Sequence, residues 1–439
     1  MESNTKAQII DAFLRLWNDS RDRTTKFEET VKGPHHLFSE NGKAILLGPD
    51  GIVAFNRLST LLNEDPAISP KFSRKELEKR IHSGAIHLFN IERSEIKAQA
   101  TAYVDQLLQQ LENATPTNWE IYLPVDNLTV NQEIIIGRTL VKMFDETTEQ
   151  LILDSFAKAS QQNTSPPEVK AETEKLIHDQ LVQNYTGRAV IRVETTAVDN
   201  ARAVESAIEL AETALNVLRF YSRGAIEYDA RAYRMQVGLK GAIFSDKLWA
   251  VAFARETLER NMHFQSTGYL HPLELSQKEL SHMENDSFRT LHEILMKEPV
   301  QRTAFEKLII NSVNLFGSAM NNPDTVAAFV YTVVALESIL LKKGEPMKTL
   351  LAERIALLLG QDFNERMFYF EQASRLYQIR SDIVHRGFGD VTESDLFLLS
   401  IIAYRIFVRL IADSPRVNDI GKLVETCNRM KFGAAKSSK

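Results

Sequence analysis

The segment RSDIVHRG, residues 380–387, places an arginine and a histidine five positions apart and ends on a glycine. An arginine side chain is permanently charged and planar, so it can hold two phosphate oxygens through parallel hydrogen bonds. An imidazole titrates near neutral pH and can pass a proton to a leaving group. Together these side chains could bind an anionic group such as phosphate and exchange a proton beside it.

The spacing of Arg380 and His385 carries no information by itself. The chain has ten histidines and 28 arginines among 439 residues. About two Arg-to-His pairs with four to six intervening residues are then expected by chance, and two occur. The other pair, Arg80 and His87, lies near the end of a shorter predicted helix. Only the surroundings of each pair can separate a site from an accident.

Arg380 is predicted to lie inside a long helix over about residues 364–385. The apolar positions of this helix share a face from which Arg380 also projects; they are Met367, Phe370, Tyr377 and Val384, with Ser374 between them. A buried guanidinium needs partners. Glu337 is a candidate, because it interrupts the apolar run VVALESILL, residues 333–341. Whether this pair is only structural or belongs to a site stays open on this evidence.

Two glycines place His385 at the end of that helix. Gly387 and Gly389 should break the helix, which leaves His385 in its last turn. A histidine at such a position is more often part of a helix cap than a catalytic group.

The order of predicted elements indicates an α+β fold with an all-α C-terminal part. Over residues 1–284 helices alternate with strands, with a hairpin expected in AILLGPDGIVAF (residues 44–55) and strands near 119–125, 133–137, 139–144 and 189–193. A loop break is expected near 160–168. From residue 285 to 439 only helices follow, the sixth of them capped by Thr392 and Asp395. We therefore predict an N-terminal α+β domain, 1–284, to which the resemblance described below assigns a sensing or regulatory role, and a helical domain, 285–439.

Composition narrows the classes of function. The apolar share of 44% and the charged share of 25% are typical of a globular protein. The net charge of −6 argues against a broad nucleic-acid-binding face, though not against a pocket for one phosphate. No apolar run reaches membrane-spanning length, and no secretory signal opens the sequence. With Cys427 as its one cysteine, the chain can form no internal disulfide, so a cytoplasmic protein without membrane association is expected.

Other chemistries find little support in the sequence. A GK[ST] phosphate loop does not occur, and His292-Glu293 lacks the second histidine of a zinc-binding HExxH motif. His35 and His36 have no acidic or cysteine companions nearby, so a surface loop is the better interpretation. Ser381 and Asp382 lie too close to His385 for a hydrolase triad on one helix. We expect neither a metal nor a cofactor.

Four blocks in order resemble the Apea-like HEPN family: ALESILL (335–341), LAERIALLLG (351–360), Glu365-Arg366 and LYQIRSDIVHRG (376–387). HEPN domains are small all-α bundles, and many are metal-independent endoribonucleases. Their signature is an arginine, usually a polar residue next, and a histidine four to six residues on; Arg380, Ser381 and His385 match it. Arg386 departs from the small residue expected there. The resemblance covers about residues 335–411, and residues 1–284 only loosely resemble the domain preceding HEPN in ApeA-type phage-defence proteins.

This resemblance implies an RNA-cleaving enzyme. Arg380 would clamp the phosphate, His385 would act as acid or as a positioning group, and Ser381 could orient either of them. Two protomers would pack their motif helices together, so a homodimer through the HEPN domain is implied. The role would be bacterial antiviral defence by abortive infection, with cellular RNA such as tRNA as substrate and a phage-derived trigger acting on the N-terminal domain. The alternative is a non-catalytic HEPN-like module that dimerises or binds RNA and regulates a partner.

Overall fold

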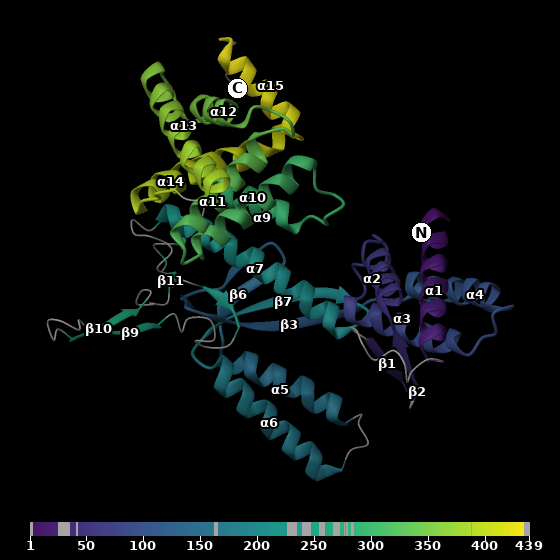
Figure 1. Ribbon diagram of the computed structural model, residues 1–439. Helices are drawn as coiled ribbons and strands as arrows, with labels where there is room; N and C mark the ends of the chain where they lie inside the picture. The colour runs from purple at the N-terminus through teal and green to yellow at the C-terminus, as the bar shows by residue number, and fades with distance from the viewer. Residues whose placement is uncertain are drawn as a thin grey trace. The chain divides into compact units, whose positions relative to one another are not determined.

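The computed structural model describes residues 3–24, 36–40, 43–161, 166–225, 235–238, 247–253, 260–266, 273–275, 277, 280–281, 285–387 and 389–433 (Figure 1). Contacts divide the chain into two compact units, one formed by 1–121 with 194–208 and the other by 122–193 with 209–439. The predicted class is confirmed, because helices combine with a small, mostly antiparallel sheet and the C-terminal region is helical. The position expected for a boundary, 284/285, lies inside the second unit, where its continuous helices begin.

The first unit is a helical cluster with one hairpin. Its helices are α1 (Ser3–Thr24), α2 (Pro49–Asn63), α3 (Arg74–Phe89) and α4 (Ile96–Asn113), and its strands β1 (His36–Glu40) and β2 (Lys43–Leu47) pair antiparallel. The helices enclose an apolar core that includes Phe13, Leu58, Leu62, Leu77 and Val104.

The hairpin predicted across residues 44–55 is wrong. Strand β2 pairs back onto β1, and the Pro-Asp-Gly stretch is the first turn of α2. Pro49 suits that position because its fixed φ is helical and its missing N–H is not needed there, while Asp50 places a negative charge at the helix N-terminus. A Cβ atom at Gly51 would meet the carboxylate of Asp19 on α1, so the glycine leaves room for that side chain.

The second unit contains most of a five-stranded sheet with the order β5-β6-β7-β3-β8. Its strands are β3 (Thr117–Asp126), β5 (Ile134–Ile136), β6 (Thr139–Met143), β7 (Ala189–Ala197) and β8 (Gln236–Val237), so the four strands predicted between 119 and 193 are confirmed. Strand β11 (Leu273–Leu275) pairs parallel with β4 (Leu128–Val130), and β9 (Lys247–Phe253) pairs antiparallel with β10 (Arg260–Ser266).

Three helices accompany this sheet. Helices α5 (Glu146–Gln161) and α6 (Pro167–Tyr185) lie side by side as a helical hairpin (Figure 1). The predicted loop break near 160–168 overlaps their junction, of which residues 162–165 lie outside the described part of the chain. The long α7 (Asn200–Ala225) follows β7 and continues from the first unit into the second.

The C-terminal part of the second unit is a helical bundle. Its helices are α9 (Asp286–Met296), α10 (Ala304–Met320), α11 (Thr325–Leu340), α12 (Met347–Leu359), α13 (Phe363–Arg386), α14 (Glu393–Asp413) and α15 (Ile420–Lys431), as the sequence predicted. Most of them start at a capping side chain, and the capping box of Thr392 and Asp395 is present at α14. Among the described residues no strand follows Leu275. Phe316, Phe329 and Phe407 are fully buried in the core.

Arg354 joins α12 to the loop that follows α11. Its side chain is 5% exposed and donates to both carboxylate oxygens of Glu345, at 2.7 and 2.8 Å, and to the Leu340 carbonyl oxygen at 2.5 Å. Removing one member of a buried ion pair leaves the other uncompensated. We expect Arg354→Ala to lower the free energy of unfolding by about 3 kcal/mol or more, measured by urea unfolding at neutral pH.

The same pair should make stability depend on acid. The hydrogen bond from Arg354 lowers the pKa of Glu345 below its ordinary value of 4.5. A carboxyl group with a depressed folded-state pKa stabilises the fold above its unfolded-state pKa, and this contribution disappears as the pH falls through the folded value. When the pH is lowered below about 5, the free energy of unfolding of Glu345→Gln should therefore fall by less than that of the wild type. Equal acid sensitivity of the two proteins would contradict this.

Candidate functional site

Arg380 lies on the buried face of α13, as predicted. Ala373, Leu376 and Tyr377 are buried, and Arg380 follows Tyr377 at i+3 on the same face. The rest of the predicted stripe is wrong at both ends, because Met367 is 40% and Val384 50% exposed. The reason is that α13 packs into the bundle through its middle turns, against α12 above all, while its ends are open to solvent (Figure 1).

Glu337 of α11 is the predicted partner of Arg380, and this pairing is confirmed. The Nη2 atom of Arg380 donates to Oε2 of Glu337 at 3.2 Å, and the two side chains are only 16% and 14% exposed. The guanidinium also lies 5.8 Å from the centre of the Tyr377 ring, within the range of a cation–π contact. Burial raises the pKa of the Tyr377 hydroxyl, and the neighbouring negative charge of Glu337 raises it further.

The ion pair between Arg380 and Glu337 is geometrically incomplete. Arginine and a carboxylate pair best through two parallel hydrogen bonds, but only one forms here. The Nε atom of Arg380 and the Oε1 atom of Glu337 are both buried, and neither has a hydrogen-bond partner. A buried polar atom left without a partner costs about 1–3 kcal/mol. The arrangement therefore does not maximise the stability of the bundle.

His385 lies in the last turn of α13 and is exposed to solvent. The helix ends as the sequence predicted: Gly387 adopts the left-handed conformation, with φ of 73°, and its N–H donates to the Ile383 carbonyl oxygen at 3.0 Å. Positions five residues apart on an α-helix are separated by about 140° around the axis and about 7.5 Å along it. The structure thus does not bring Arg380 and His385 onto one face of α13.

The residues around the motif form a small charged surface. Arg386, the departure from the family pattern, is exposed and its Nε lies 3.4 Å from Oδ1 of Asp382, which also accepts from Gln378 at 3.2 Å. Ser381 beside Arg380 is half-buried. Sequence reasoning treated Tyr377 only as an apolar position and missed its contact with Arg380; an aromatic residue three positions before a buried arginine was the available signal.

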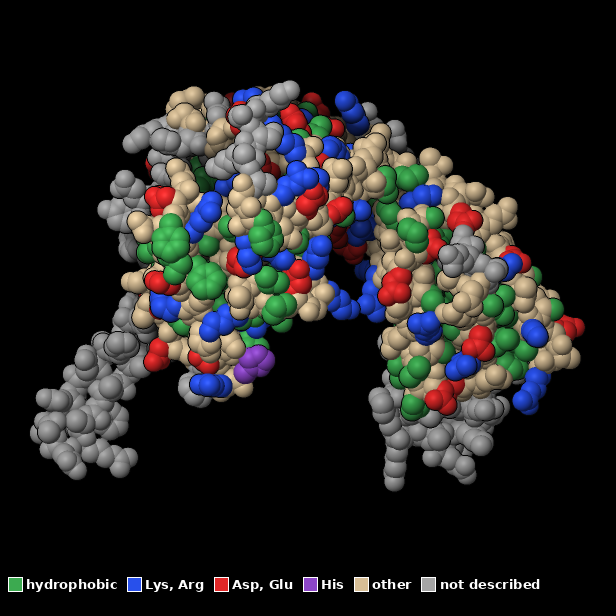
Figure 2. All heavy atoms as spheres, turned by 90° about the horizontal axis from the view of Figure 1, so that it is seen from above, with side chains coloured by type: hydrophobic (Ala, Val, Ile, Leu, Met, Phe, Trp, Pro, Cys, Tyr) green, Lys and Arg blue, Asp and Glu red, His purple; other side chains and the backbone are tan. Residues whose placement is uncertain are grey.

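Charges of both signs share the surface of each unit. Lys and Arg side chains are interspersed with Asp and Glu on the face seen in Figure 2. This agrees with the net charge of −6. A ligand that carries phosphate would thus depend on a local contact such as Arg380 rather than on a wide basic face.

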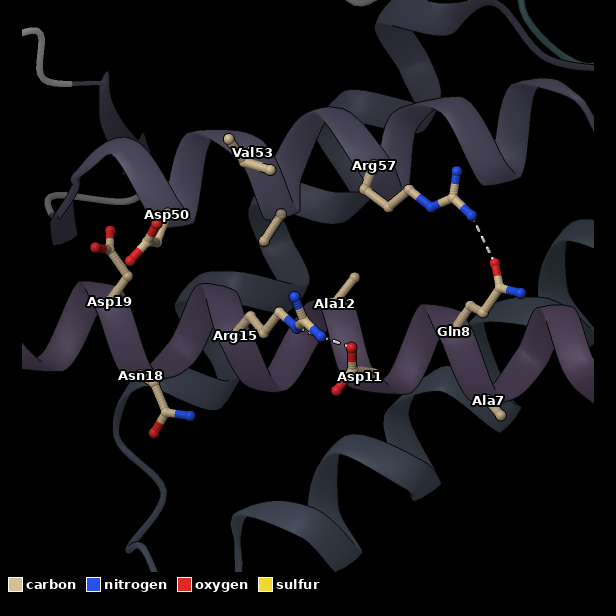
Figure 3. Close-up of a pocket in the computed structure, with 11 residues that line it drawn as sticks. Ala7, Gln8, Asp11, Ala12, Arg15, Asn18, Asp19, Asp50, Val53 and Arg57 are labelled. Carbon is tan, nitrogen blue, oxygen red and sulfur yellow. Dashed lines mark hydrogen bonds and ion pairs between the residues drawn. The ribbon is translucent and has the colours of Figure 1, made fainter.

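The first unit contains a surface groove of 940 Å³ between α1 and α2 (Figure 3), which no sequence motif predicted. Several of the polar side chains that line it already form ion pairs or hydrogen bonds. Arg15 pairs with Asp11 at 2.8 Å, Arg57 donates to Gln8 at 2.7 Å, and Asp19 accepts from the Gly48 N–H. The groove therefore offers few uncommitted polar groups for a ligand.

The described residues hold no group of three or more His, Cys, Asp or Glu side chains placed to bind a metal ion. His292 accepts a hydrogen bond from the Gly137 N–H at 3.2 Å through Nδ1, which is a structural role. His35 lies outside the described residues, and only the backbone of His36 is described. Within the described part of the chain, no helix has the length and apolar character needed to cross a membrane.

Comparison of this chain with protein-family models, with curated proteins and with solved structures found no match. The fold and the site geometry are therefore the observations on which a function must be argued.

Proposed function

We propose that this chain is a metal-independent endoribonuclease of the HEPN type, with Arg380 and His385 as its catalytic residues. The observation that carries the proposal is the placement of the motif. A half-buried guanidinium lies on a bundle helix with an incomplete set of partners, and an exposed imidazole lies two residues before the glycine that ends the same helix. The resemblance of residues 335–411 to the Apea-like HEPN family supports the same function.

The chemistry needs these two groups, the substrate, and water to accept the proton that the attacking 2′-hydroxyl loses. RNA carries its own nucleophile, the 2′-hydroxyl, which attacks the adjacent phosphorus and forms a 2′,3′-cyclic phosphate. Arg380 would stabilise the negative charge that develops on the phosphate oxygens. His385 would donate its proton to the departing 5′-oxygen. Ser381, next to Arg380, would orient either group.

A second protomer would complete the site. Arg380 and His385 leave α13 on different faces, so two copies of the helix, packed together, would place an arginine and a histidine from different chains against one bond. Val384, an apolar side chain next to His385 that is 50% exposed, fits such packing. This supports a homodimer through the helical part of the second unit.

The proposed biological role follows from the family resemblance. The enzyme would act in bacterial antiviral defence by abortive infection, cutting cellular RNA such as tRNA. Residues 1–284 would respond to a phage-derived trigger and restrain the nuclease until it arrives.

The direct test uses purified full-length protein with tRNA and total RNA. We expect cleavage that leaves 2′,3′-cyclic phosphate and 5′-hydroxyl ends, because the nucleophile is internal to RNA. A substrate with one 2′-deoxy sugar at the mapped site should stay intact, and EDTA should not change the rate. Cleavage of the deoxy substrate would contradict the proposed chemistry. Loss of RNA cleavage in EDTA would contradict it as well.

The alternative is a non-catalytic HEPN-like module that dimerises or binds RNA and regulates a partner. One observation favours it: the Arg380 guanidinium is occupied by Glu337 and does not share a face with His385. RNA that stays intact under every condition, including after addition of a phage lysate, would favour this alternative over the nuclease.

A further inference from the structure

The guanidinium of Arg380 has two uses that compete with each other. A phosphate clamp requires N–H groups of this guanidinium, and the structure commits Nη2 to the Glu337 carboxylate while burying Nε. The carboxylate also places a negative charge next to any phosphate that approaches Arg380. In the arrangement described here, Arg380 is thus neutralised and only 16% exposed.

We propose that Glu337 is the residue that withholds Arg380 from substrate, and that activation is the release of Arg380 from the Glu337 carboxylate to an RNA phosphate. This inference rests on the proposed function, because it assigns a regulating role at the same site. It assigns to Glu337 an effect opposite to that of a supporting residue: its removal should accelerate the reaction.

The geometry makes this release feasible. A single hydrogen bond of 3.2 Å holds the pair, and the second bond that a fork arrangement would add is not formed. Once Arg380 moves outward, its buried Nε gains access to solvent or to phosphate. The Tyr377 hydroxyl lies beside Glu337 and can donate a hydrogen bond to its carboxylate after Arg380 has moved away.

A second ion pair in the same bundle shows that the incomplete geometry is specific to the motif. Arg354 engages both oxygens of Glu345 and a backbone carbonyl oxygen as well. That pair has the two-bond geometry expected of an ion pair that stabilises the fold. The pair of Arg380 and Glu337 lacks it, and it lies on the helix that carries the signature residues.

The test compares RNA cleavage by the wild type with that by Glu337→Gln, which keeps the size and hydrogen-bonding capacity of the side chain but removes its charge. We expect cleavage to be about tenfold faster, because a neutral amide oxygen holds the guanidinium less strongly than a carboxylate oxygen does. Binding of an uncleavable 2′-deoxy-substituted RNA should tighten in the same variant. If Glu337→Gln folds poorly, Glu337→Asp serves as the second variant. It draws the carboxylate back by one methylene and should show a smaller gain in cleavage rate.

Asp382→Asn is the matched control. Asp382 lies two residues from Arg380 and carries the same negative charge as Glu337. It pairs with Arg386 and not with Arg380. An equal gain in both variants would reduce the effect to general electrostatics and overturn the proposal, as would a wild-type or slower rate for Glu337→Gln. The nuclease assignment fails separately, if neither protein cleaves RNA; tighter binding of the uncleavable RNA by Glu337→Gln would still support the restraint, and unchanged binding would overturn it.

Discussion

Replacing Arg380 with alanine should reduce RNA cleavage by at least about 10²-fold, the usual effect of removing one group that stabilises developing charge. The other partly buried arginine on this face of α13, Arg366, lies fourteen residues away and donates to the Gly360 carbonyl oxygen at 3.3 Å, so it cannot replace the guanidinium. Growth toxicity and phage protection should be lost with the activity. The measurement is single-turnover cleavage of a mapped RNA substrate by the purified variant.

Two companion variants make this result interpretable. Arg380→Ala leaves Glu337 half-buried without its cation, which destabilises the bundle; the double variant Arg380→Ala/Glu337→Gln removes that burden and should remain inactive. Arg386→Ala deletes an exposed arginine of the same helix and should retain activity. If the double variant cleaves RNA at the wild-type rate, Arg380 is not catalytic.

Replacing His385 with alanine should slow cleavage by about 10²- to 10⁴-fold, the range for the loss of a general acid. Because His385 is exposed and ends a helix, the free energy of unfolding should change by no more than about 0.5 kcal/mol. A loss of rate without a loss of stability is the expected signature, measured by cleavage kinetics and urea unfolding on the same preparation.

A modified substrate tests the role of His385 directly. An RNA with sulfur in place of the departing 5′-oxygen needs no proton to complete the reaction, so His385→Ala and the wild type should cleave it at similar rates. His178→Ala is the matched control. It removes a half-exposed histidine that contacts Glu149 and is far from His385 in the sequence. A persistent defect on the sulfur substrate would instead indicate that His385 positions the RNA.

Local signals accounted for most of the elements. The helices from residue 285 onward were predictable because most of them begin at a capping side chain, such as Thr303 with Glu306 or Thr392 with Asp395, and these caps act within one turn. The partnership of Glu337 with Arg380 was predictable for a related reason. Both charges interrupt apolar runs, and a charge on a buried face needs a counter-charge.

Long-range packing decided the features that sequence reasoning misjudged. The Pro-Asp-Gly stretch suits a turn and the first turn of a helix equally well; in the structure it begins α2, which buries Ala54, Leu58 and Leu62 in the core of the first unit. The pattern of α13 could not reveal which turns would find neighbours, so Met367 and Val384 were assigned to a face that remains open. The two compact units alternate along the chain, because β3, β7 and α7 each continue from one unit into the other, and no local sequence pattern marks these positions.

The sequence by itself determined the helical C-terminal region, the end of α13 at Gly387 and the identity of Arg380, His385 and Glu337 as a candidate set. Only the tertiary structure decided that Arg380 and Glu337 share one hydrogen bond while two of their buried polar atoms remain without partners. The physical reason is range. Helix caps and glycine ends depend on neighbours within a few residues, whereas the geometry of an ion pair depends on how α11 and α13, 43 residues apart at this contact, pack together.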